Sequence, residues 1–278
     1  MPVFDTTEAI SATVKIEVGR ARIIAGKRTD TVVDVAPSDP GDKRDVLAAE
    51  DTEVAYADGE LLVKGPKSHS PFTRTGSVDV TVQLPAGSEL IGSTGLGDLI
   101  GEGRFGNCRL TSGAGDIHLE EATTVRLKTA HGDITVDRVT GGTEIRGSGR
   151  VRVGRIGGDA TVRNHNGETT IGEVTGELEV TSANGPVGVV RAESSVTART
   201  SNGPIRIDQV IRGRITVESS AGGLEIGIAK GTAAWLDMEA RAGRVRNELG
   251  RARGPEQSEE RVEIHGRTSV GDIVIRRA

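Results

Sequence analysis

Aromatic side chains are scarce in this chain of 278 residues, which contains three Phe, one Tyr and one Trp. Proteins that hold nucleic-acid bases or sugar rings commonly stack them on aromatic side chains, so this scarcity argues against a stacking site. One cysteine excludes an internal disulfide framework. Apolar runs are short as well. None approaches the roughly 18 residues of a transmembrane helix, and we expect no membrane-spanning segment.

Neither sign of charge is in large excess, since 35 Lys and Arg stand against 40 Asp and Glu, a formal net charge of -5. A mildly acidic protein does not attract nucleic acid or anionic lipid in bulk, and we expect no nucleic acid as a partner. The second half is more basic, because residues 141–278 hold 20 basic against 18 acidic residues. Nearly all of these basic residues are Arg, which fits either a solvated face or a stripe that binds an anion or a partner.

Glycine is abundant and periodic. The chain has 39 Gly, roughly twice the usual share, and in its middle they recur every 17 to 19 residues. The repeating positions are Gly97, Gly115, Gly132, Gly149, Gly167, Gly185, Gly203 and Gly222. Apolar residues stand two and four positions after most of them, with polar residues between. This alternation is typical of a half-buried strand, and a second alternating pair follows later in each unit.

A unit of about 18 residues with two short strands cannot bury its own apolar face, whereas a stack of such units can. We therefore predict an all-β fold, a single-stranded parallel β-helix (β-solenoid) with coils of about 18 residues. We expect residues 1–90 to form an N-terminal β region and cap that leads into regular repeats over 91–278. An insertion is expected around 251–260, a short helix within 38–50, and one continuous domain overall.

Asparagine marks three of the turns. Asn166, Asn184 and Asn202 lie 18 residues apart, each directly before a Gly of the repeat. Asn tolerates the left-handed backbone that such a turn requires. In stacked coils these amides would lie over one another and form a hydrogen-bonded ladder, as Asn side chains do in other parallel stacks.

Several motifs together resemble a known family. They are the Gly-Asp-Ile and Asn-Gly-Pro-Ile turns, the segments 82–87 and 234–237, and the ending 268–275. Over residues 11–278 the chain resembles the bacterial β-strand-repeat family of unknown function whose members are named as candidate adhesins. The resemblance implies a right-handed β-helix, and it brings no catalytic residues.

Asp98, Asp116 and Asp133 occupy the same position, directly after Gly, in three successive coils. We interpret them as turn residues. The alternative is a cation site, because carboxylates stacked about 4.8 Å apart repel one another unless a cation or a proton lies between them. No His or Cys pattern has the spacing of a metal site, and we expect no cofactor.

Enzymatic readings find little support in the sequence. Glycoside hydrolases need two carboxylates that flank the scissile bond, and the repeat does not place such a pair. Trp235 fits a core or end-cap position better than a sugar platform. Cys108 stands two residues before Leu110 in a predicted strand, which points its side chain inward.

We therefore expect a non-enzymatic structural or protein-interaction solenoid, adhesin-like, that binds a partner through its flat faces. The alternatives are a β-helical carbohydrate-active enzyme and a cation-binding solenoid that uses the Asp column. Residues 1–8 show no secretion signal, so a cytoplasmic protein is expected. We also expect a monomer or small oligomer, because Arg276 and Arg277 on a final strand would oppose end-to-end stacking.

Overall fold

The computed structural model of the chain describes residues 1–66, 75–249 and 260–278. It divides into two compact units, Met1–Arg138 and Val139–Ala278. All of the predicted insertion around 251–260 except Glu260 lies outside the described residues. Within the described ranges no helix is long and apolar enough to cross a membrane.

The first unit contains one helix and nine complete strands among its described residues. These are β1 (Val3–Asp5), β2 (Ser11–Gly26), β3 (Asp30–Pro37), α1 (Lys43–Glu50), β4 (Glu53–Ala57), β5 (Glu60–Lys64), β6 (Val78–Pro85), β7 (Glu89–Leu96), β8 (Leu99–Ala114) and β9 (Ile117–His131); β10 (Ile134–Val139) ends at the boundary. The helix falls inside the predicted 38–50 window. It begins after Asp42, whose side chain accepts a hydrogen bond from the Arg44 N–H at 2.9 Å and so caps the first turn.

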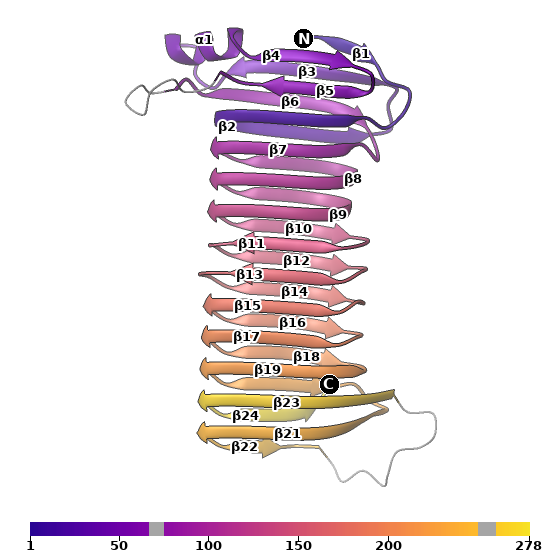
Figure 1. The fold of residues 1–278 in the computed structure, drawn as a ribbon, viewed down its shortest axis with the longest axis vertical. Coiled ribbons are helices and arrows are strands. Elements are labelled where there is room, and N and C mark those ends of the chain that lie inside the picture. The colour runs from indigo at the N-terminus through magenta and orange to yellow at the C-terminus, as the bar shows by residue number, and fades with distance from the viewer. Residues whose placement is uncertain (67–74, 250–259) are drawn as a thin grey trace. The chain divides into compact units, whose positions relative to one another are not determined.

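Strand order in the first unit does not follow chain order. The first half of β2 lies between β5 and β7, and its second half lies between β6 and β8, all in parallel pairs (Figure 1). Beyond these layers the pairing changes, because β3 pairs antiparallel with β6 and with β1, and β4 pairs antiparallel with β5. The N-terminal region thus includes antiparallel strands that the repeat did not indicate.

The second unit consists of short strands joined by tight turns. They are β11 (Thr143–Gly147), β12 (Val151–Ile156), β13 (Ala160–Asn164), β14 (Thr169–Val174), β15 (Leu178–Asn184), β16 (Val187–Ala192), β17 (Val196–Asn202), β18 (Ile205–Val210), β19 (Gly213–Ala221), β20 (Leu224–Ile228), β21 (Thr232–Ala242), β22 (Val245–Asn247), β23 (Glu260–Val270) and β24 (Ile273–Arg277). Each strand from β11 to β18 pairs in parallel with the strand two places later. Two strands therefore make one coil, and the predicted β-solenoid with coils of about 18 residues is confirmed.

Register alignment builds the core as columns of like side chains. One column contains Val151, Thr169, Val187, Ile205, Leu224 and Ile273, all buried. All six members are β-branched or aliphatic, as a pleated and closely stacked surface favours. The narrow core thus follows directly from the alternation in the sequence.

Glycine allows the turns to stack closely. Gly185 has φ +118°, and a Cβ atom built on it would lie 2.2 Å from the carbonyl oxygen of Gly167 in the preceding coil. A side chain would therefore clash with the backbone and strain the turn. This close approach explains why glycine recurs at this position.

The last coil in sequence is not the last coil in space. β23 lies between β19 and β21, and β24 lies between β20 and β22 (Figure 1). Arg276 donates a hydrogen bond to Glu225 at 2.8 Å, and the Arg277 guanidinium donates to two backbone carbonyl oxygens. The expectation that Arg276 and Arg277 guard an open terminal strand is therefore wrong, since β24 has a strand on each side.

Candidate binding face

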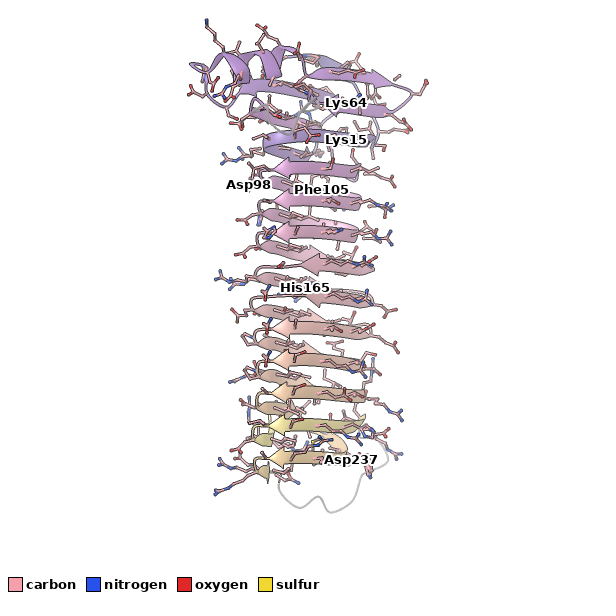
Figure 2. All side chains as sticks on the ribbon, turned by 60° about the vertical axis from the view of Figure 1, so that its left-hand side comes forward. Lys15, Lys64, Asp98, Phe105, His165 and Asp237 are labelled. Carbon is pink, nitrogen blue, oxygen red and sulfur yellow. The ribbon has the colours of Figure 1, made fainter. Side chains whose placement is uncertain are left out.

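The three turn aspartates of the first unit lie in consecutive turns, and Asp98 is at the turn edge of its coil (Figure 2). Oδ1 of Asp98 accepts a hydrogen bond from the Asp116 N–H at 3.0 Å, and Oδ1 of Asp116 accepts one from the Asp133 N–H at 2.8 Å. One carboxylate oxygen thus holds the next coil in place. Asp159 does the same for Glu177 in the second unit. No group of three or more His, Cys, Asp or Glu within the described ranges could hold a metal ion.

The asparagines of the second unit form a ladder. Asn184 Nδ2 donates to Asn166 Oδ1 at 3.1 Å, and Asn202 Nδ2 donates to Asn184 Oδ1 at 3.0 Å. All three side chains are exposed, so water competes for each of these bonds. The ladder is therefore a surface feature that keeps neighbouring turns in register.

A second polar column lies inside the turns of both units, although its members Ser182 and Thr200 have no hydrogen-bond partner among the described residues. Buried hydroxyls donate to glycine carbonyl oxygens in four pairs: Ser112 to Gly97, Thr129 to Gly115, Ser219 to Gly203 and Thr268 to Gly222. In one coil Asn164 takes this position and donates to Gly149 O at 2.9 Å. These bonds satisfy carbonyl groups that the sharp turn leaves without a strand partner.

The outer surface of one sheet of the second unit is a flat face built from β13, β15, β17, β19, β23 and β21, which we call the odd-strand face. These strands pair in parallel in that order and without a register shift. Outward side chains therefore line up in rows that cross the strands. One row contains Arg163, Thr181, Arg199, Glu218, Arg267 and Glu239.

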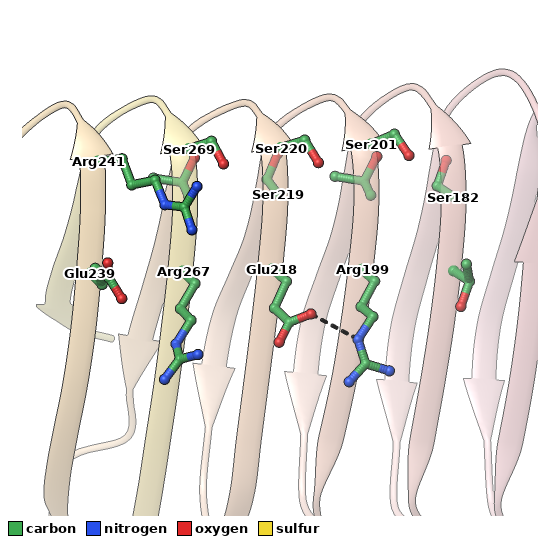
Figure 3. Close-up of a pocket in the computed structure, with 13 residues that line it drawn as sticks. Ser182, Arg199, Ser201, Glu218, Ser219, Ser220, Glu239, Arg241, Arg267 and Ser269 are labelled. Atoms are coloured by element: carbon green, nitrogen blue, oxygen red, sulfur yellow. Dashed lines mark hydrogen bonds and ion pairs between the residues drawn. The ribbon is translucent and has the colours of Figure 1, made fainter.

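A groove of about 460 Å³ crosses this face over β15, β17, β19, β23 and β21 (Figure 3). Along one side lies a row of serine hydroxyls, from Ser201, Ser220 and Ser269, on three neighbouring strands. The other side carries the charged row. None of the thirteen lining residues is aromatic, so the groove offers hydrogen bonds and charge but no stacking surface.

The charges in the groove are only partly paired. Arg199 Nε donates to Glu218 Oε2 at 2.9 Å, and both side chains remain about half exposed. Arg241 and Arg267 have no ion pair or side-chain hydrogen bond to any described residue. Arg241 extends toward the strand that bears Ser269 and Arg267 (Figure 3). Two guanidinium groups therefore line the groove with no described carboxylate bonded to either.

Comparison with protein-family models identifies the family of the chain. The model described as Toastrack DUF4097 matches residues 14–277, nearly the whole sequence. The chain belongs to this family. The predicted membership of a β-strand-repeat family of unknown function is thereby confirmed.

Solved structures also resemble this Toastrack chain. A putative cell adhesion protein from Clostridium sporogenes ATCC 15579 shares 11% identity, with a TM-score of 0.23 and coverage of 100% of this chain and 98% of that chain. A putative adhesin from Parabacteroides distasonis ATCC 8503 shares 8% identity, with a TM-score of 0.34 and coverage of 100% and 95%. No curated protein matches the chain.

One histidine of this Toastrack chain, His265, contacts acidic side chains and a tryptophan on β21 and β23. The sequence did not predict this grouping. His265 Nε2 lies 2.8 Å from Glu263 Oε1, and His265 Nδ1 lies 3.3 Å from Asp237 Oδ2. The hydrogen bond from His265, with a second from Arg214, lowers the pKa of Glu263. Trp235 packs against the His265 ring at 5.3 Å between centroids and is 57% exposed. Of the two positions expected for Trp235, core or end cap, the core position is therefore wrong, whereas β21 pairs with β23 alone among the described strands, as an end cap would.

Sequence reasoning missed the groove for a simple reason. Its charged row joins β19 to β23, and Glu218 and Arg267 are 49 residues apart in the chain. The spacing of 17 to 19 residues does not reach that far, because residues 229–259 intervene between the two coils. The general signal, an Arg-rich second half, was visible, but the positions of the unpaired Arg residues were not.

Proposed function

We propose that this Toastrack chain is a non-enzymatic binding protein that holds a protein partner on its odd-strand face. The observation that carries the proposal is the groove, in which Arg241 and Arg267 have no partner among the described residues. Solenoids generally use extended faces of stacked strands for binding. The regular rows support this use, because a flat surface with evenly spaced donors can contact a partner over several coils.

The groove suits hydrolysis poorly. Glu218 and Glu239 are two strand spacings apart, roughly 9.6 Å, which is at the upper limit for an inverting pair of carboxylates. A general acid also needs an apolar pocket that keeps its proton. Glu218 instead lies in a row between Arg199 and Arg267, and no aromatic ring lines the groove to hold a sugar. These features support binding over catalysis.

Site-specific crosslinking tests the proposal. A photoreactive amino acid at Ser220 would sit in the groove, and the same amino acid at Val190, which is 50% exposed on β16, would report on the opposite sheet. After irradiation in the native cells, we expect discrete protein adducts from position 220 and none from position 190. Equal adducts from both positions, or none from position 220, would contradict the use of this face.

A further inference from the structure

The groove on the odd-strand face also indicates what kind of partner segment fits it. We infer that it takes an acidic, extended segment of a partner protein, whose carboxylates pair with Arg241 and Arg267. This inference rests on the proposed function and names the chemistry of the segment that is bound. Four observations carry it: the two guanidinium groups, the serine row, the open shape of the groove and the absence of aromatic side chains.

The guanidinium groups identify the ligand as an anion. Arg241 on β21 extends toward β23 beside Ser269, whereas Arg267 on β23 extends away from the serine row, so the two guanidinium groups lie on adjacent strands at separate points along the groove (Figure 3). Each guanidinium is a positive charge without a described partner, so a carboxylate at each of the two points adds a favourable interaction. The planar guanidinium presents two parallel N–H donors that match the two oxygens of a carboxylate.

The serine row favours a ligand that lies across the strands. Ser201, Ser220 and Ser269 lie on β17, β19 and β23, about 4.8 Å from strand to strand. Their hydroxyls can donate to carboxylate or backbone carbonyl oxygens and can accept from N–H groups. A polypeptide in extended form offers both kinds of group at short intervals. The groove crosses five strands, so several residues of such a segment fit along it.

The two carboxylates in the groove disfavour polyanions with a higher charge density along the chain. Glu218 and Glu239 also line the groove, and each would repel a polymer that carries a phosphate at every step. In an extended polypeptide alternate side chains point away from the groove, so even poly-glutamate presents a carboxylate to it only about every 6.6 Å and can avoid these two positions. An acidic polysaccharide is a weaker candidate, because no lining side chain can stack on a sugar ring. The observations therefore favour an acidic peptide segment.

The test measures binding of fluorescent poly-L-glutamate by anisotropy at low salt. We expect binding that weakens about threefold in Arg241→Gln or Arg267→Gln and about tenfold in the double variant, as for partly exposed ion pairs. Glu239→Gln should bind about threefold more tightly, because it removes a repulsive charge. These side chains are exposed or make no described hydrogen bond, so the variants should fold normally.

Arg152→Gln is the matched control. It removes the same charge from an exposed position on β12, on the opposite sheet, and should leave the affinity unchanged. Binding that is lost equally in Arg152→Gln would reflect net charge alone and would overturn the inference. An unchanged or weaker affinity in Glu239→Gln would also overturn it.

Two comparison probes separate the ligand classes. If polygalacturonate or inorganic polyphosphate binds through Arg241 and Arg267 while poly-L-glutamate does not, the peptide assignment is wrong. If no probe binds but position 220 still crosslinks a protein, the odd-strand face is a binding face and only the acidic assignment fails. If position 220 crosslinks nothing, the proposed function itself fails.

Discussion

Asn164 and Thr169 depart from the repeat in the same coil, and the structure explains the two departures together. Asn164 stands in a column otherwise occupied mainly by Ser and Thr, and Thr169 stands in a column of aliphatic residues. Both side chains are buried, and Asn164 Nδ2 donates to Thr169 Oγ1 at 3.1 Å. The hydroxyl of Thr169 therefore gives the buried amide a third acceptor, besides the carbonyl oxygens of Gly149 and Gly167.

A double-mutant cycle tests this pairing. Thr169→Val should lower the free energy of unfolding by about 1–2 kcal/mol, because it removes an acceptor from a buried amide. In the Asn164→Ser/Thr169→Val variant, which restores both columns to their usual residue types, most of that loss should be recovered. Urea unfolding of the four proteins gives the coupling energy, expected at about 1 kcal/mol. Purely additive effects would show that the two departures are independent.

Cys108 illustrates a residue whose role could be predicted from the alternation alone. It is 3% exposed in β8, and burial raises the pKa of its thiol to about 12. The thiolate is the reactive form, so at pH 8 only a very small fraction can react. We expect the native protein to resist a maleimide until urea unfolds it. Rapid labelling without denaturant would contradict the inward placement.

At the scale of the element, the exposure of the Asn ladder lowers the loss of stability that we expect when one of its side chains is removed. Stacked amides without a neighbour would be costly if they were buried, but Asn166, Asn184 and Asn202 are exposed. Asn184→Ala removes two hydrogen bonds, one to each neighbour. Water replaces both, so we expect a loss of only about 0.5–1 kcal/mol in thermal or urea unfolding. Asn184→Asp is the control, because it keeps the size and places a charge in the ladder.

The alternation and the glycine period were enough to predict the coils, because both follow from local geometry. Successive side chains of a strand point to opposite faces, so the face that a residue occupies depends only on whether its position is odd or even. A turn position depends only on the backbone conformations that Gly and Asn tolerate. The stacking order of coils was not predictable in the same way. Several strands of the chain could pair in parallel with β19 and pack against its aliphatic side chains Ile215 and Val217. The sequence alone does not show that β23 is the strand that does so.

At the scale of the whole molecule, the position of β24 between two other strands overturns the expectation that its two Arg residues prevent end-to-end assembly. Arg276 pairs with Glu225 at 2.8 Å, and Arg277 donates to the carbonyl oxygens of Ala229 and Thr232. Replacing both with Thr should therefore lower the free energy of unfolding by about 1–3 kcal/mol. It should not promote assembly of the folded protein. Urea unfolding measures the first effect, and light scattering below the unfolding transition measures the second.

The control for that experiment is Arg152→Thr/Arg244→Thr, which removes the same charge from exposed side chains of the second unit that make no hydrogen bond or ion pair to a described residue. It should leave the unfolding midpoint nearly unchanged. Concentration-dependent filaments from the Arg276→Thr/Arg277→Thr protein, without loss of stability, would restore the original interpretation of these residues as guards against stacking.

The insertion of β23 and β24 between earlier coils has a consequence during synthesis. Coils up to β20 can stack on their predecessors as they leave the ribosome, but β21 and β22 have no neighbour in the finished fold until β23 and β24 exist. About 50 residues separate Ile228 from Ala278, which takes roughly 3–10 s to translate. For that interval β19 and β20 remain an uncovered edge on the nascent chain. Translation speed over residues 229–278 therefore sets how long this edge of the nascent chain can pair with a wrong neighbour.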